Sequence, residues 1–158
     1  MQRYELLQNL HFVKGIDPVA DAFSGTVASD VVDVSNHGGA LFLVYKGVGT
    51  TGTSTITVEA CDDVTPSNTT AVPFYYKAIT SNDVQGAMTA AAAAGFATTA
   101  GSSQIYAVAV DSQELASAGY KYVRLKAVEV VDSPVLGGIA IALYQPRFGG
   151  SATNSAID

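Results

Sequence analysis

The chain has 158 residues, a net charge of −6, two histidines and a single cysteine. This length suits one domain with a substantial core, and one cysteine excludes an intrachain disulfide. The negative charge disfavours binding to a phosphate backbone. Only 14% of the residues are charged. Either a partner covers part of the surface, or Ser, Thr and Gly keep the domain soluble without many charges.

The first predicted element is an N-terminal arm, residues 1–25. It is too apolar for a free tail, which favours either a short helix ending near Gly15 or an arm docked on a neighbour. We expect it to contact another subunit or a partner molecule through Tyr4, Leu6, Leu7, Leu10 and Phe12. No apolar run approaches the roughly 18 residues of a membrane span, and from the pattern of the first residues we do not expect a signal peptide.

Alternating apolar and β-branched residues predict strands throughout residues 26–148. They are expected at 26–34, 40–46, 53–61, 73–79, 104–110, 120–131 and 133–144. The stretch 40–46 is apolar on both faces, which indicates a central or doubly covered strand. Polar turns, rather than amphipathic helices, join the strands. The sequence therefore predicts an all-β domain, an antiparallel β-sandwich or jelly-roll-like fold.

Two segments lie outside this pattern. Residues 83–103 are rich in Ala, Gly and Thr, and we expect a long loop whose small residues pack against another subunit. Its expected contact residues are Ala91, Ala93 and Phe96. Residues 149–158 (GGSATNSAID) are predicted to form a flexible C-terminal tail.

No motif typical of catalysis emerges. Residues 47–52 match G-x-G-x-x-G, but a β-branched stretch follows where a nucleotide site needs a helix, so a hairpin connection is expected. His37 lies too close in sequence to Ser35 and Asp33 for a triad and is expected to be a solvated turn residue. His11 is interpreted as part of the apolar arm. We expect no catalytic, cofactor-binding or metal-ligating residues.

Acidic and basic residues receive structural interpretations. Asp62, Asp63 and Asp111 lack the spacing of a calcium loop and are expected to cap loops. Glu59, with Glu129, is expected to point outward from a strand into solvent. Arg124 and Lys126 share a strand face, where they would be solvated or paired with carboxylates rather than bind nucleic acid. Exposed tyrosines leave a sugar-binding platform open, at Tyr75, Tyr76, Tyr120 and Tyr122.

Several stretches together resemble small virion proteins encoded in tailed-bacteriophage structural gene clusters. They are DPVADAF at 17–23, ITVEACDD at 56–63, YKYVRLK at 120–126, PVLGG at 134–138 and LYQPRF at 143–148. The chain looks like the head-decoration, or cement, class over most of residues 15–148. The resemblance carries no individual functional residue with it.

The resemblance implies a β-rich protein without enzymatic activity that binds the outer capsid surface. Its partners would be the major capsid protein and itself, as a homotrimer, with no cofactor, nucleic acid or membrane. It would be made in the host bacterial cytoplasm and reside on the virion, where bridging capsid subunits through several contacts stabilises the head. The alternatives are another virion component of the tail, neck or fibre, or a particle-displayed carbohydrate-binding module.

Overall fold

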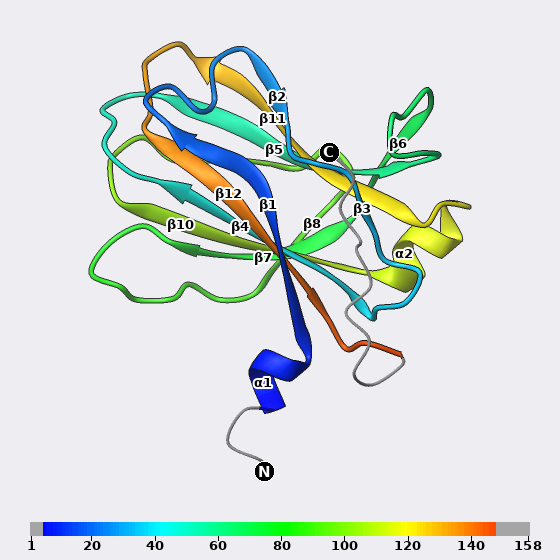
Figure 1. The fold of residues 1–158 in the computed structure, drawn as a ribbon. Helices are drawn as coiled ribbons and strands as arrows, with labels where there is room; N and C mark the ends of the chain where they lie inside the picture. The colour runs from blue at the N-terminus through cyan, green and yellow to red at the C-terminus, as the bar shows by residue number, and fades with distance from the viewer. Residues whose placement is uncertain (1–4, 148–158) are drawn as a thin grey trace.

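The computed structural model describes residues 5–147, which form two antiparallel sheets packed face to face (Figure 1). Sheet I has the order β1 (Leu10–Val19), β12 (Gly137–Tyr144), β4 (Gly39–Lys46), β10 (Gln104–Asp111), β7 (Phe74–Ile79) and β8 (Thr89–Ala91). Sheet II has the order β2 (Thr26–Ala28), β11 (Tyr122–Val131), β5 (Thr53–Cys61) and β6 (Thr69–Val72), with β3 (Val32–Asp33) on β11 and β9 (Phe96–Ala97) on β5. The helices are α1 (Glu5–Gln8) and α2 (Ser112–Ser117). The expectation of an all-β sandwich is confirmed.

The antiparallel strand pairs are nested within one another. β1 pairs with β12, β2 with β11, β4 with β10, and β5 with β6, so each pair encloses the next along the chain. Successive pairs lie in alternate sheets. This is the arrangement of one long antiparallel ribbon rolled into two layers. Most strand connections therefore cross between the layers.

The glycine-rich segment 47–52 is one of these crossings. It joins β4 in sheet I to β5 in sheet II, so the expected hairpin is wrong. The segment packs closely against its neighbours, and a Cβ on Gly52 would collide with the carbonyl oxygen of Ser133. The glycine thus permits a tight arch between layers, and a β-strand follows it as predicted.

The core lies between the two sheets and follows the period-2 pattern of the strands. Inward residues of 53–61 are as expected, with Ile56, Val58 and Ala60 fully buried. From the other strands, the fully buried large side chains include Phe42, Val44, Tyr106, Val108, Leu125, Ile141 and Leu143. Each such side chain contributes roughly 1.5–3 kcal/mol by burial.

The predicted N-terminal arm is largely part of the domain. Residues 10–19 form edge strand β1, and Ala22 and Phe23 are buried in the core. Irregular register after Lys14 and again after Ile16 breaks the alternation that would have indicated a strand. Within the described part of the arm, α1 extends beyond the sandwich (Figure 1). Tyr4 and the predicted tail 149–158 lie outside the described residues.

The alanine-rich segment is also more ordered than a loop. It contains β8 and β9, which add to sheets I and II respectively. Ala91 is buried in the domain's own core, and Phe96 stacks on Tyr76 with ring centroids 3.8 Å apart. Ala93 is half-buried. Ala91 thus belongs to the domain's own core, whereas Ala93 and Phe96 are half-buried, and the contact role of these residues stays a prediction.

Smaller differences involve local hydrogen bonds. The strand expected at 26–34 is divided into β2 and β3, because Ser29 exchanges hydrogen bonds with Leu125 through both its backbone and its hydroxyl. Helix α2 and strand β6 were not predicted. The α2 helix begins where the Asp111 side chain accepts a hydrogen bond from the Gln113 amide at 2.8 Å, which is an N-cap.

Lys46 is a buried cation that joins two connections between the sheets through hydrogen bonds. Its side chain is only 2% exposed, and Nζ donates to the carbonyl oxygens of Gly52 at 3.0 Å and Thr99 at 2.6 Å. A third, longer hydrogen bond of 3.4 Å reaches Oε1 of Gln104. Burial lowers the pKa of Lys46, but the surrounding oxygens still satisfy its donors.

Replacing Lys46 with methionine tests this role. Lys46→Met keeps the apolar stem but leaves the carbonyls of Gly52 and Thr99 without a donor, so we expect a loss of about 1–3 kcal/mol in the free energy of unfolding. Urea unfolding monitored by circular dichroism measures it. The matched control is Lys14→Met at an exposed position, which should change stability by less than about 0.5 kcal/mol. Equal stability of the two variants would contradict the assignment.

Candidate interaction surface

The outer face of sheet I, which points away from sheet II, is apolar. On β4, residues alternate between the core and this face, so Leu41, Leu43 and Tyr45 point outward. Ile105 and Ala107 lie beside them on β10. Neither helix nor any loop of residues 5–147 buries this set, which is half-buried or exposed.

Register arranges the outer residues in rows across the sheet. The first row is Gly138, Tyr45, Ile105 and Ile79. The second is Lys14, Ala140, Leu43, Ala107 and Lys77. The third is Phe12, Ala142, Leu41, Ala109 and Tyr75. In the second row, the small and exposed Ala140 on β12 lies beside the larger Leu43 on β4, which leaves a hollow in the sheet at this point.

The hollow is a groove of about 970 Å³. Its walls include Phe12 and Pro18 of β1 on one side and Leu43 and Tyr45 of β4 on the other, and Ala140 lies between them. The volume is comparable to that of a small-molecule site. Few polar groups line it, however, so it lacks the means to orient a polar ligand. The groove suits apolar protein side chains better.

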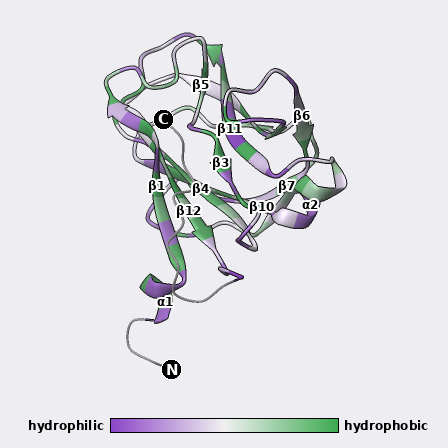
Figure 2. Cartoon of the chain, turned by 45° about the vertical axis from the view of Figure 1, so that its right-hand side comes forward, coloured by the Kyte–Doolittle hydropathy of each residue, from purple (hydrophilic) through white to green (hydrophobic). Residues whose placement is uncertain are grey.

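Three large side chains rise from this face and remain half exposed. The exposed fractions are 59% for Phe12, 51% for Tyr45 and 53% for Tyr75. Figure 2 shows hydrophobic colour along β4 and β12. Lys14 and Lys77 end the second row, and within residues 5–147 neither forms an ion pair. Apolar patches with a polar rim mark sites of protein association.

The predicted contact residues of the N-terminal arm that the structure describes divide between this face and α1. Phe12 lies on the face, and Leu10, half-buried, lies one row further along β1. Leu6 and Leu7 are exposed on α1. Sequence analysis missed Leu41, Leu43, Tyr45 and Ile105. The sequence feature that could have identified them is the stretch 40–46, which is apolar on both faces. Strand β4 is central as predicted, but the described residues cover only one of its faces.

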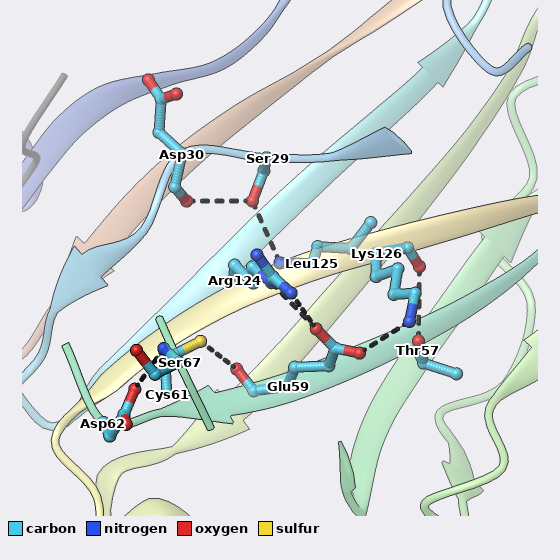
Figure 3. Close-up of polar contacts among 10 residues, drawn as sticks. All are labelled: Ser29, Asp30, Thr57, Glu59, Cys61, Asp62, Ser67, Arg124, Leu125 and Lys126. Atoms are coloured by element: carbon cyan, nitrogen blue, oxygen red, sulfur yellow. Dashed lines mark hydrogen bonds and ion pairs between the residues drawn. The ribbon is translucent and has the colours of Figure 1, made fainter. Parts of the chain in front are cut away.

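The outer face of sheet II carries an ion cluster instead (Figure 3). The carboxylate of Glu59 accepts hydrogen bonds from Arg124 at 2.7 and 2.8 Å and from Lys126 at 3.0 Å. Burial alone would raise the pKa of Glu59, but the hydrogen bonds from Lys126 and Arg124 outweigh it and lower the pKa. The expectation that Glu59 is solvated is wrong, and pairing of the two cations with a carboxylate is confirmed.

The two histidines lie close together. Their ring centroids are 6.3 Å apart, and His37 is buried, so the predicted solvated ring is wrong. His37 Nδ1 has no hydrogen-bond partner in the part of the chain that the structure describes. Burial, then the charge of His11, lowers the pKa of His37, while Asp33 opposes this. Asp33 caps the turn by accepting from the Ser35 amide, so it does not orient the ring as a triad acid would.

The remaining candidate ligands have structural roles. Asp62 accepts hydrogen bonds from the amides of Ser67 and Asn68, so its loop-capping role is confirmed. Burial raises the pKa of Cys61 to about 11, which keeps the thiol protonated at neutral pH. Among residues 5–147, no three His, Cys, Asp or Glu side chains are grouped as a metal site. Neither described helix is long and apolar enough to cross a membrane.

Comparison with known proteins finds no matching family model, no matching curated protein and no matching solved structure. The resemblance to phage decoration proteins therefore stays a prediction.

The Glu59 cluster gives a prediction for stability. Glu59→Gln leaves Arg124 and Lys126 without a charged partner, and we expect a loss of about 1–3 kcal/mol, because both cations keep some contact with solvent. Glu114→Gln, in an exposed position of α2, is the matched control and should be neutral.

Since the folded-state pKa of Glu59 is lowered, its contribution to stability is present above the unfolded pKa and is lost as pH falls through the folded pKa. Denaturant unfolding at neutral pH and near pH 3 checks both points, and an advantage of wild type that does not shrink between the two pH values would contradict them.

The histidine pair gives a second prediction. Because the folded-state pKa of His37 is lowered, its neutral form is favoured by folding, so stability should be full above about pH 6.5 and fall below it. In His37→Gln, the difference in unfolding free energy between pH 7.5 and 5.5 should shrink. Thermal melts at the two pH values measure it. An unchanged difference would assign the pH dependence to other groups.

Proposed function

We propose that this chain is a virion assembly protein of a tailed bacteriophage, which decorates the outer capsid surface and stabilises the head by bridging major capsid protein subunits. The outer face of sheet I carries the proposal, because it offers apolar area for association on a domain that does not need that area to fold. The sequence resemblance supplies the setting.

The strand arrangement supports a jelly roll as the finer description of the fold. A ribbon of four nested pairs, β1 with β12, β2 with β11, β4 with β10 and β5 with β6, divides eight strands into two four-stranded layers. β7, β8 and the short strands extend these layers. Jelly rolls recur in viral capsid and lectin domains, which agrees with a role on a particle.

A non-enzymatic role is supported by how the polar side chains are used. Lys46, Glu59 and Asp62 each bind partners within the domain. Their charges stabilise crossings, strands and loops, and they do not converge on the apolar groove. Binding at this surface would then draw on apolar burial, with the rim lysines contributing to orientation.

Two alternatives remain proposals. A tail, neck or fibre component would use the same surface at another virion position, and electron cryomicroscopy of the particle separates the two.

A carbohydrate-binding module is favoured by one observation, the half-exposed rings of Tyr45 and Tyr75 on the same face. Aromatic faces are common sugar platforms. A glycan array gives a signal only if the module binds sugar.

Binding to capsids tests the leading proposal. We expect the purified chain to co-sediment with DNA-free shells of the phage that encodes it and to raise their melting temperature. Tyr45→Asp places a charge on the apolar face and should weaken binding by at least about tenfold, equivalent to about 1.4 kcal/mol. Val130→Asp replaces an equally exposed apolar residue on β11 of sheet II and should bind as wild type does.

Thermal melts of both variants establish that each is folded before binding is compared. If wild type neither co-sediments with shells nor changes their melting temperature, capsid decoration is wrong. If both variants bind as wild type does, the decoration role stands and the outer face of sheet I is not the surface that serves it.

A further inference from the structure

Helix α1 carries two leucines that its own domain leaves exposed. Leu6 is 72% exposed and Leu7 64% exposed. The helix is connected to the domain through β1, and it ends where the Asn9 amide donates to the carbonyls of Glu5 and Leu6. A helix of four residues does not hold its shape in water without a packing surface. We therefore expect the two exposed leucines on this turn to pack against a partner.

The domain's own groove lies away from α1. The helix precedes Leu10, which is paired with Tyr144 at one end of sheet I. The groove is lined by β1 from Phe12 to Pro18 and by Leu136. The rise along a strand places Lys14 roughly 13 Å beyond Leu10. As Figure 1 shows, α1 continues away from the sandwich rather than folding back over sheet I.

We propose that α1 of one copy docks in the groove on the outer face of sheet I of a second copy. Leu6 and Leu7 would enter the hollow over Ala140, between Phe12 on one wall and Leu43 on the other. The groove has an apolar lining and suits these two side chains.

Charge supports the same pairing. Lys14 lines the groove and Lys77 ends the same row of sheet I, and neither has an ion-pair partner within residues 5–147. Glu5 is the acidic residue of α1 and lies next to the leucines. Docking α1 would bring the Glu5 carboxylate to a rim where Lys14 and Lys77 outnumber the one carboxylate that lines the groove, Asp17. Burial of the leucines is thus the main contribution, and the excess of positive charge at the rim favours the same occupant.

The symmetry of the assembly follows from the contact. The helix and the groove are different surfaces of the same chain, so the contact is head-to-tail, and it closes into a ring when the rotation between copies permits. The expected homotrimer is one such ring. One docked turn is small beside the roughly 1,200–2,000 Å² of a stable interface, so ring closure must add to each contact. This inference deepens the proposed decoration role and rests on it for its biological setting only.

Sedimentation velocity of the isolated full chain, without capsids, tests the proposal. Wild type should sediment as an oligomer at micromolar concentration. The arm variant Leu6→Asp/Leu7→Asp and the groove variant Ala140→Trp, which fills the hollow at an exposed position, should sediment as monomers. Val130→Asp is the matched control and should stay oligomeric. Thermal melts verify that every variant is folded.

Mixing the variants makes the test specific. The arm variant keeps an intact groove and the groove variant keeps an intact arm, so each pair in a mixture can form one contact but cannot close a ring. We therefore expect heterodimers that neither variant forms alone, only at concentrations well above those at which wild type assembles, and nothing larger. A chain carrying Leu7→Cys and Ala140→Cys should form intermolecular disulfides on oxidation, whereas wild type should not, because Cys61 is buried. The cross-linked product identifies the two surfaces directly.

The overturning results are separate from those of the decoration role. A monomeric wild type, or an arm variant that remains oligomeric, would contradict the docking of α1 on a second copy. If wild type is monomeric and the arm variant loses capsid binding, the partner of α1 is the capsid and the second copy is excluded, while the decoration role stands. If wild type forms the oligomer but does not bind shells, the arm contact stands and decoration fails.

Discussion

The register of β4 is the constraint on which the rest of the structure depends. Each of its eight residues pairs with both β10 and β12. Because side chains alternate along a strand, placing Phe42 and Val44 in the core forces Leu41, Leu43 and Tyr45 onto the opposite face. A slip of one residue would exchange the two sets. The domain thus fixes an apolar outer face whenever it forms its core.

That outer face lies outside the core of the domain. The core between the sheets is built from the inward residues, and Phe12, Tyr45 and Tyr75 on the outer face keep about half of their area exposed. The charged side chains Lys46 and Glu59, by contrast, are used inside the domain, where they join crossings and strands. What the domain offers to other molecules is therefore apolar area and shape, with little free polar chemistry.

The elements that sequence predicted well are those governed by local alternation. Strands β4 and β5 were placed within a residue of their ends. For β5 the signal is uninterrupted alternation of apolar and polar residues, and for β4 it is a short apolar run between glycines. Strand β1 was missed because its register shifts beyond Lys14 and again beyond Ile16, which puts successive apolar residues out of phase. Leu6 and Leu7 of helix α1 were predicted as contact residues together with Leu10 and Phe12 of β1, and all four are half-buried or exposed.

Long-range pairing explains the other differences. The alanine-rich segment has weak local preference, and β8 and β9 exist because Phe74 and Ile56 provide strand partners far away in sequence. The surface on sheet I depends on the same kind of information. Leu43 is recognisable as outward only when β4 is known to be central, and Ala140 becomes the floor of a groove only when β12 is placed between β1 and β4.

The contrast between the two outer faces shows that the fold itself does not demand an apolar surface. Strand β5 is as central to sheet II as β4 is to sheet I, yet its outward residues are Thr53, Thr55, Thr57 and Glu59. Its neighbour β11 adds Arg124 and Lys126, which pair with Glu59. The same sandwich therefore accommodates polar residues on one outer face. Threonine, with its β-branched side chain, would serve equally well on β4. Leucine and tyrosine on β4, beside the exposed Ala140, are not required by the sandwich, and they therefore support the proposal that another molecule binds to sheet I.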